Sequence, residues 1–160
     1  MVVSALIIAA DQAAKYAIVT LTPHGASYPL TSYFNLVHVW NLGAAFSFLA
    51  DAGGWQRYAF IALGICISTT LAVLLYRGLT NRLEAPAFAL IIGGALGNVT
   101  DRISLGYVVD YLDFHWQGWH WPAFNIADIA ITTGAVMLVA ASRLESNASA
   151  NQEITHSKSG

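Results

Sequence analysis

A stretch of 19 residues without a charged side chain, at positions 58–76, constrains this chain more than any other feature. About 20 predominantly apolar residues in a helix cross the hydrocarbon core of a bilayer. The composition agrees, because 56% of the residues are hydrophobic and only 10% are charged, whereas soluble domains carry about 25% charged residues. The sequence therefore predicts a membrane protein with a transmembrane helix over residues 58–76.

Three other segments are apolar enough to be membrane helices, and they cover about residues 2–21, 85–101 and 123–142. The first does not resemble a cleavable secretory signal, because it has no basic region and no small-x-small site followed by a soluble domain. Asp11 and Lys15 lie in it four residues apart, so their side chains can pair on one face. The predicted fold class is an all-α membrane protein with four transmembrane helices, forming one domain over residues 1–142.

The segments between and after these helices differ in composition. Residues 22–54 contain prolines, glycines and the partly alternating stretch YFNLVHVW, which predicts a small extramembrane β-rich platform between the first and second helices. Residues 103–121 are expected to be aqueous or interfacial, with three tryptophans that resemble an aromatic belt at the lipid headgroups. Residues 143–160 are rich in Ser, Asn and charge and are predicted to form a disordered tail.

The distribution of Lys and Arg predicts the orientation in the membrane. Four spans place both termini on one side, and cytoplasmic loops carry an excess of Lys and Arg. The side with the termini has four of these cations, Arg77, Arg82, Arg143 and Lys158, and the other side has three, Lys15, Arg57 and Arg102. We therefore expect cytoplasmic termini and an outward-facing platform.

Composition and motifs also exclude several functions. The net charge of −2 provides no basic surface for nucleic acid, and a single cysteine excludes an intramolecular disulfide. The polar pattern Asp110, Asp113, His115 and His120 could be read as metal ligands, but no His-Glu-x-x-His motif accompanies it. No metal site is expected, and no Gly-x-Ser-x-Gly nucleophile motif is present.

Three carboxylates in the second half of the chain are the candidates for chemistry. Asp101 ends the third predicted helix, Asp110 follows in the outer segment, and Asp128 opens the fourth helix. The predicted topology therefore gathers them at the outer face of the bundle, together with three polar residues at helical spacing, Asn98, Arg102 and Asn125. Two carboxylates that lie close together share a proton, so one can activate water while the other protonates a leaving amine. This arrangement predicts peptide-bond hydrolysis without a metal.

Two other interpretations use the same residues. Acids near helix ends can be caps that only stabilise the fold, and acids inside membranes often mark a proton or ion path, which would make this a small translocating protein. The residues alone do not decide whether Asp101 or Asp110 is the partner of Asp128.

Five motifs together resemble the lipoprotein signal peptidase family, also called signal peptidase II. The motifs are DQAAK (11–15), NLGAAFSFL (41–49), GGALGNVTDR (93–102), GYVVDYLDF (106–114) and FNIADIAITTG (124–134). The resemblance extends from about residue 10 to about residue 139. It implies an aspartyl endopeptidase with four spans in the bacterial cytoplasmic (inner) membrane, with its active site near the outer face.

The resemblance also assigns roles and partners. It implies that the enzyme removes the signal peptide from prolipoproteins whose cysteine carries diacylglycerol, cleaving before that cysteine, with no cofactor. Asp110 and Asp128 match the catalytic pair. The residues expected to support the pair or bind substrate are Asn41, Asn98, Arg102, Asn125, Asp11, Lys15 and Asp101. Signal peptides and membrane lipids are the expected partners, and the enzyme is expected to be a monomer.

Overall fold

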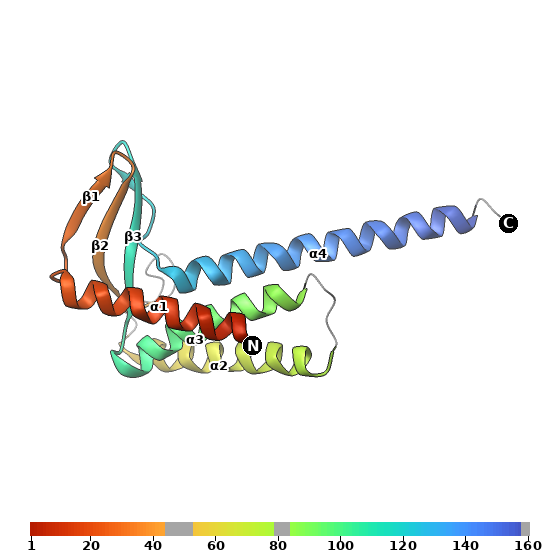
Figure 1. Ribbon diagram of the computed structural model, residues 1–160, viewed down its shortest axis with the longest axis horizontal. Helices are drawn as coiled ribbons and strands as arrows, with labels where there is room; N and C mark the ends of the chain where they lie inside the picture. Colours follow the sequence, from red (N-terminus) through yellow and green to blue (C-terminus); the bar gives the residue numbers. More distant parts are fainter. Residues whose placement is uncertain (44–52, 79–83, 158–160) are drawn as a thin grey trace.

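The computed structural model describes residues 1–43, 53–78 and 84–157, and four long helices dominate it. They are α1 (Val2–Leu21), α2 (Trp55–Tyr76), α3 (Glu84–Ser104) and α4 (Ile126–Ser157). The helices run roughly side by side, and both termini point away from a small sheet at the other end (Figure 1). Residues 44–52 of the predicted platform segment and 158–160 of the predicted tail lie outside the described residues, as do Arg82 and Lys158.

Three of the described helices are long and apolar enough to cross a membrane: Val2–Leu21, Trp55–Tyr76 and Ile126–Leu144 within α4. Helix α3 is not among them, so the prediction of four membrane helices is supported only for three. Helix α3 is less apolar than these three spans because its last two turns contain Asn98, Asp101 and Arg102. These polar side chains are buried inside the bundle and do not face lipid. A central helix needs less lipid-compatible surface than its neighbours.

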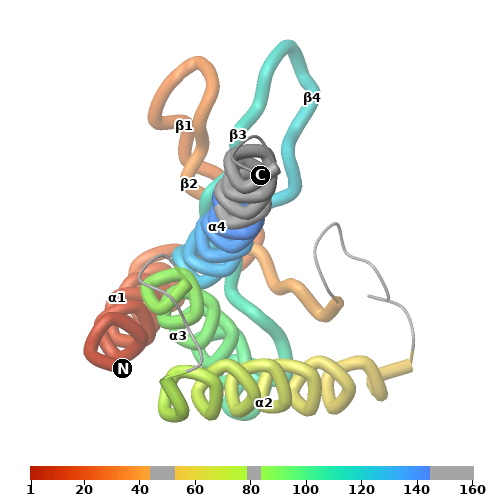
Figure 2. Tube along the Cα trace, turned by 90° about the vertical axis from the view of Figure 1, so that its right-hand side faces the viewer, coloured from red at the N-terminus to blue at the C-terminus, as the bar shows by residue number. Residues whose placement is uncertain are grey.

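Helix α3 lies between the other three helices, as the view along the bundle shows (Figure 2). Its glycines allow this close approach. A Cβ atom at Gly94 would collide with the carbonyl oxygen of Ala127 on α4, and one at Gly97 would lie 2.8 Å from Asp11 Oδ2 on α1. The small side chains of α3 therefore bring the amino-terminal turn of α4 and the polar middle of α1 against the same helix.

The platform is a four-stranded antiparallel sheet in the order β1-β2-β3-β4. Its strands are β1 (Ser27–Thr31), β2 (Phe34–Asn41), β3 (Val108–Trp116) and β4 (Trp119–His120). Half of the sheet therefore comes from the segment between α3 and α4, where no strand was predicted, so the mostly helical membrane fold with a small β-rich platform is confirmed and the platform is larger than expected. The stretch VVDYLDF is rich in β-branched and aromatic residues, but its pairing partner, β2, lies about 70 residues away in the sequence.

The end of the chain also differs from the prediction. Helix α4 continues to Ser157, whereas the composition of residues 143–160 predicts a disordered tail. Ala, Leu, Glu and Gln in this segment are good helix formers, and neither Gly nor Pro occurs in it before Gly160. An established helix therefore propagates beyond the apolar part of α4.

Candidate active site

Asp110 is the third residue of β3, in the part of the strand that follows α3. Its side chain is buried, with 2% of its surface exposed. Each carboxylate oxygen accepts a hydrogen bond from an amide: Asn41 Nδ2 donates to Oδ2 over 2.9 Å, and Asn125 Nδ2 donates to Oδ1 over 2.7 Å. Strand β2 contributes the first amide, and the start of α4 contributes the second.

Asp128 lies in the first turn of α4, where it forms a reciprocal cap with Asn125. The Asp128 backbone N–H donates to Asn125 Oδ1 over 3.0 Å, and the Asn125 backbone N–H donates to Asp128 Oδ2 over 3.2 Å. Such a capping box satisfies two backbone donors that a helix start leaves free. The other oxygen, Asp128 Oδ1, accepts a bond of 2.8 Å from Asn98 Nδ2 on α3. Asn125 therefore contacts both Asp110 and Asp128.

Asp101 has a different environment, although the sequence alone left it as an equal candidate. Its Oδ2 atom lies 2.9 Å from Lys15 Nζ and accepts a 3.1 Å hydrogen bond from the Val109 backbone N–H. Its Oδ1 atom accepts a 2.8 Å bond from Gln12 Nε2. The negative charge of Asp101 is thus compensated by Lys15. Its carboxylate also holds the β3 backbone at Val109, next to Asp110.

Two buried ionisable side chains on α1, Asp11 and Lys15, connect α1 with α3 and α4. Lys15 Nζ lies 2.8 Å from Asp11 Oδ2 and donates to Asn98 Oδ1 over 2.9 Å, while Asn98 in turn donates to Asp128. Asp11 Oδ1 accepts a 2.9 Å bond from the Ala127 backbone N–H, so it caps the start of α4 from a neighbouring helix. Both ionisable side chains are nearly inaccessible, with exposures of 0% for Asp11 and 3% for Lys15.

Sequence reasoning missed Gln12. Its amide also contacts the carbonyl oxygen of Gly97, at 3.2 Å, so it bridges α1 and α3 beside the buried ions. The available signal was its place next to Asp11 in an otherwise apolar helix.

Arg102 connects α3 with the segment after β2. Its Nη2 atom donates to the Gly43 carbonyl oxygen over 2.8 Å, and its Nη1 atom donates to the Asn98 carbonyl oxygen over 3.3 Å. The guanidinium carbon lies 5.0 Å from the centre of the Phe60 ring on α2, within range of a cation–π interaction. Residues 44–49 of the NLGAAFSFL motif lie outside the described residues.

The environment of Asp110 favours its protonated form. Burial and the nearby charge of Asp128 raise the pKa of Asp110 to about 7, although the amide bonds from Asn41 and Asn125 act in the opposite direction. Desolvation is the largest of these effects, because it penalises a charged carboxylate. Asp110 can therefore hold a proton near neutral pH and exchange it.

A cavity of about 490 Å³ opens beside Asp128. Asn41, Asn98, Arg102 and Asp128 form its polar side. The remaining, mostly apolar lining comes from the start of β3, the segment before α4 and α4 itself: Val108, Trp121, Pro122, Ala123, Phe124, Ile129, Ile131, Thr132 and Thr133. Since α4 contains a candidate membrane span, the apolar side of the cavity extends along a membrane helix. In the part of the chain that the structure describes, no group of three His, Cys, Asp or Glu side chains is placed to hold a metal ion.

The fold and the site define a membrane enzyme in which a mostly helical bundle carries a buried carboxylate, Asp110, and a half-buried one, Asp128, beside a largely apolar cavity. A solved structure described as a bacterial membrane enzyme, determined by the in meso method, matches with a TM-score of 0.81 and 30% identity, covering 91% of this chain and 87% of that chain. A second structure with the same description matches with a TM-score of 0.75 and 28% identity, covering 88% and 89% of the two chains.

Sequence comparison names the family. The family model described as signal peptidase (SPase) II matches residues 3–144. The lipoprotein signal peptidase of Paraburkholderia phytofirmans is 53% identical over 86% of this chain and 80% of its own length. That of Serratia marcescens is 48% identical over 94% of this chain and 88% of its own length. The chain belongs to the signal peptidase II family and is therefore a peptidase of lipoprotein processing.

Proposed function

We propose that this protein is an aspartic endopeptidase that removes the signal peptide from prolipoproteins, cleaving before a diacylglyceryl-modified cysteine. The family and the names of the relatives support the substrate. The observation that carries the catalytic type is the position of Asn125, which hydrogen-bonds to both Asp110 and Asp128, and Asp128 lines the cavity. Asn125 links the two carboxylates through its side-chain amide, which donates to Asp110, and its backbone N–H, which donates to Asp128, and carboxylates held together in this way can divide acid and base roles.

The proposed mechanism assigns the proton to Asp110. A pKa of about 7 makes Asp110 a proton donor at neutral pH. Asp128 is the ionised partner, since it lies at a helix N-terminus and accepts hydrogen bonds from Asn98 and Asn125. Asp128 takes a proton from water as the water oxygen attacks the scissile carbonyl carbon, and Asp110 protonates the nitrogen that leaves when the carbon–nitrogen bond breaks.

The surrounding residues have supporting roles in this proposal. Asn98 and Asn41 orient one carboxylate each, at 2.8 and 2.9 Å. Arg102 lines the cavity with its guanidinium anchored on Gly43, where it can receive a substrate carbonyl. Hydrogen bonds in such a low-dielectric site are stronger than the same bonds in water.

The proposed orientation places the site near the outer face of the bacterial cytoplasmic membrane. The platform lies at one end of the bundle, and the termini extend toward the other (Figure 1). Asp110 is on β3 of the platform, and Asp128 is in the first turn of α4. Arg77 follows the membrane span of α2, and Arg143 lies in the last turn of the α4 span, Ile126–Leu144, which supports cytoplasmic termini. We further propose that α3 is a fourth span, that the substrate enters from the surrounding lipids, and that the enzyme acts as a monomer.

The test is cleavage of a synthetic peptide with a signal sequence and an S-diacylglyceryl cysteine by the purified protein, with and without a chelator. We expect chelator-insensitive cleavage. Asp110→Asn and Asp128→Asn should each reduce kcat by a factor of about 10² to 10⁴ at normal yield, as loss of a general acid or base does. Normal turnover in either variant would refute the pair.

Asp101→Asn is the matched variant, because it removes a third buried carboxylate that pairs with Lys15 instead. It should lower the yield of folded protein more than the turnover of the molecules that fold. A selective loss of turnover at normal yield would transfer the catalytic role from Asp110 to Asp101.

A further inference from the structure

A second buried carboxylate on β3, Asp113, lies three residues after Asp110 and takes no part in the mechanism above. Only 6% of its surface is exposed. Asn35, its cross-strand neighbour on β2, donates from Nδ2 to Asp113 Oδ2 over 2.8 Å. His120 Nδ1 lies 2.9 Å from the same oxygen and 3.0 Å from Asp113 Oδ1. The side chain of His120 is half-exposed, so the carboxylate is buried beneath an imidazole that it holds in place.

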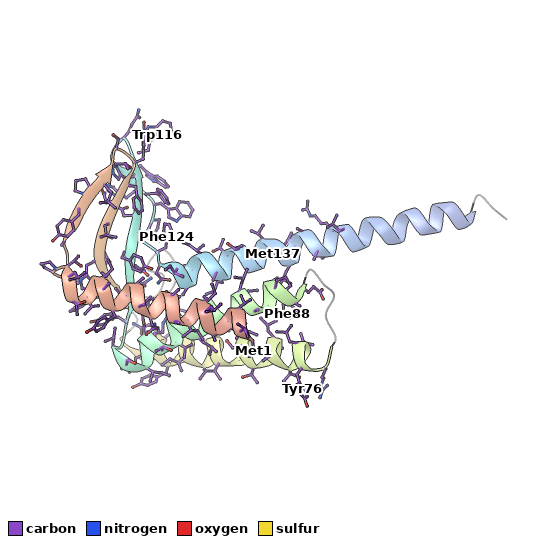
Figure 3. All side chains as sticks on the ribbon, viewed as in Figure 1. Met1, Tyr76, Phe88, Trp116, Phe124 and Met137 are labelled. Atoms are coloured by element: carbon purple, nitrogen blue, oxygen red, sulfur yellow. The ribbon has the colours of Figure 1, made fainter. Side chains whose placement is uncertain are left out.

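His120 belongs to the short strand that returns from the tip of the platform. β3 and β4 are joined by Gln117 and Gly118, both with positive φ (50° and 83°), as a tight two-residue hairpin turn requires. The turn lies next to Trp116, at the far end of the sheet from the helices (Figure 3). The Asp113–His120 contact therefore joins the returning strand to β3 close to this turn.

The four residues that follow His120 are the wall of the active-site cavity, since Trp121, Pro122, Ala123 and Phe124 all line it. The wall is held at two ends. The Trp121 backbone N–H donates to the Phe114 carbonyl oxygen over 2.8 Å, directly beside His120. At the other end, Phe124 exchanges backbone hydrogen bonds of 2.9 and 3.0 Å with Leu112.

We propose that Asn35, Asp113 and His120 form a clamp that positions the wall 121–124 and thereby determines how tightly the cavity binds the apolar residues of the substrate. This inference rests on the proposed function, because the cavity must receive the signal peptide. Asp113 and His120 are positioning residues, since they act through the wall.

The clamp should affect binding more than chemistry. Asn125, which contacts both catalytic candidates, follows Phe124, and the Phe124–Leu112 pair and the capping box hold it independently of His120. Release of His120 therefore loosens the wall near Trp121 and leaves the carboxylates in place. The apolar wall contacts substrate without touching the reacting bond, so it contributes to ground-state and transition-state binding alike.

The experiment compares His120→Leu with His120→Asn, since the Asn amide can donate near the position of Nδ1 and Leu cannot. We expect His120→Leu to raise KM about tenfold while kcat changes less than about twofold, and His120→Asn to stay within about threefold of the unmodified protein in KM. An unchanged KM in His120→Leu, or an equal loss of kcat in both variants, would overturn the clamp.

Two further measurements separate this inference from a general structural effect and from the catalytic proposal. In a Trp121→Ala background, His120→Leu should add less than about twofold to KM, because both changes disrupt the same wall; full additivity would contradict the clamp.

Binding of the diacylated peptide to an Asp128→Asn variant, with and without His120→Leu, measures the clamp without turnover. If the peptide binds but is never cleaved by the unmodified protein, the proposed function fails while the clamp is still tested.

Discussion

Removing the amide of Asn41 should move the pH dependence of catalysis in a defined direction. The hydrogen bond from Asn41 Nδ2 to Asp110 Oδ2, 2.9 Å long, stabilises the ionised carboxylate and lowers the pKa of Asp110. Burial and Asp128 still raise that pKa to about 7. If Asp110 must be protonated for catalysis, activity is lost as pH rises through this value. Asn41→Leu takes away a donor to the charged form, so the pKa rises further and the loss of activity moves to higher pH.

The size of this change follows from the strength of the bond. A hydrogen bond to a charged group contributes about 1.5–3 kcal/mol, and 1.36 kcal/mol corresponds to one pKa unit. Asn41 is only partly buried, so water replaces part of the lost bond. We therefore expect the alkaline limb of kcat/KM to move up by about one pH unit.

The assay is the pH profile of kcat/KM for the diacylated peptide, which reports the free enzyme. Asn35→Leu is the matched control, because it removes an equivalent amide on the same strand whose acceptor is Asp113. This control should leave the alkaline limb near pH 7, whatever its effect on KM. An alkaline limb that moves downward in Asn41→Leu, or one that moves equally in both variants, would refute the assignment of the proton to Asp110.

Three further predictions concern stability, measured by unfolding of the purified protein in detergent. Because folded Asp110 binds its proton more tightly than an ordinary carboxyl of pKa 3.8, its contribution to the unfolding free energy should fall by about 3 kcal/mol from pH 4 to 7, and Asp110→Asn should remove this contribution. Lys15→Met leaves two buried acids without their cation and should cost about 3–5 kcal/mol; a loss below 1 kcal/mol would contradict the pairing. Gly94→Ala meets the Ala127 carbonyl and should cost about 1–3 kcal/mol, whereas Thr100→Ala at an exposed position should change stability by less than about 0.5 kcal/mol.

Much of the site could be predicted because its residues lie where apolar helices end. Asn98 and Asp128 each adjoin an uncharged run, and the three- and four-residue spacings identify which side chains share a helix face. The choice between Asp101 and Asp110 could not be made in this way. It depends on Lys15, which lies 2.9 Å from Asp101 although 86 positions separate the two residues in the chain.

The sequence by itself determined that the chain is a membrane protein, because 19 consecutive uncharged residues at 58–76 have few alternatives to a lipid-facing helix. It also determined which polar side chains would lie near one another at helix ends. Only the tertiary structure decided that Asp110 is on a strand, since the strand requires long-range pairing with β2. The same pairing places Asp110 against Asn41 and, through Asn125, beside Asp128. Local propensity cannot specify such contacts, because their stabilisation comes from partners that the fold brings together.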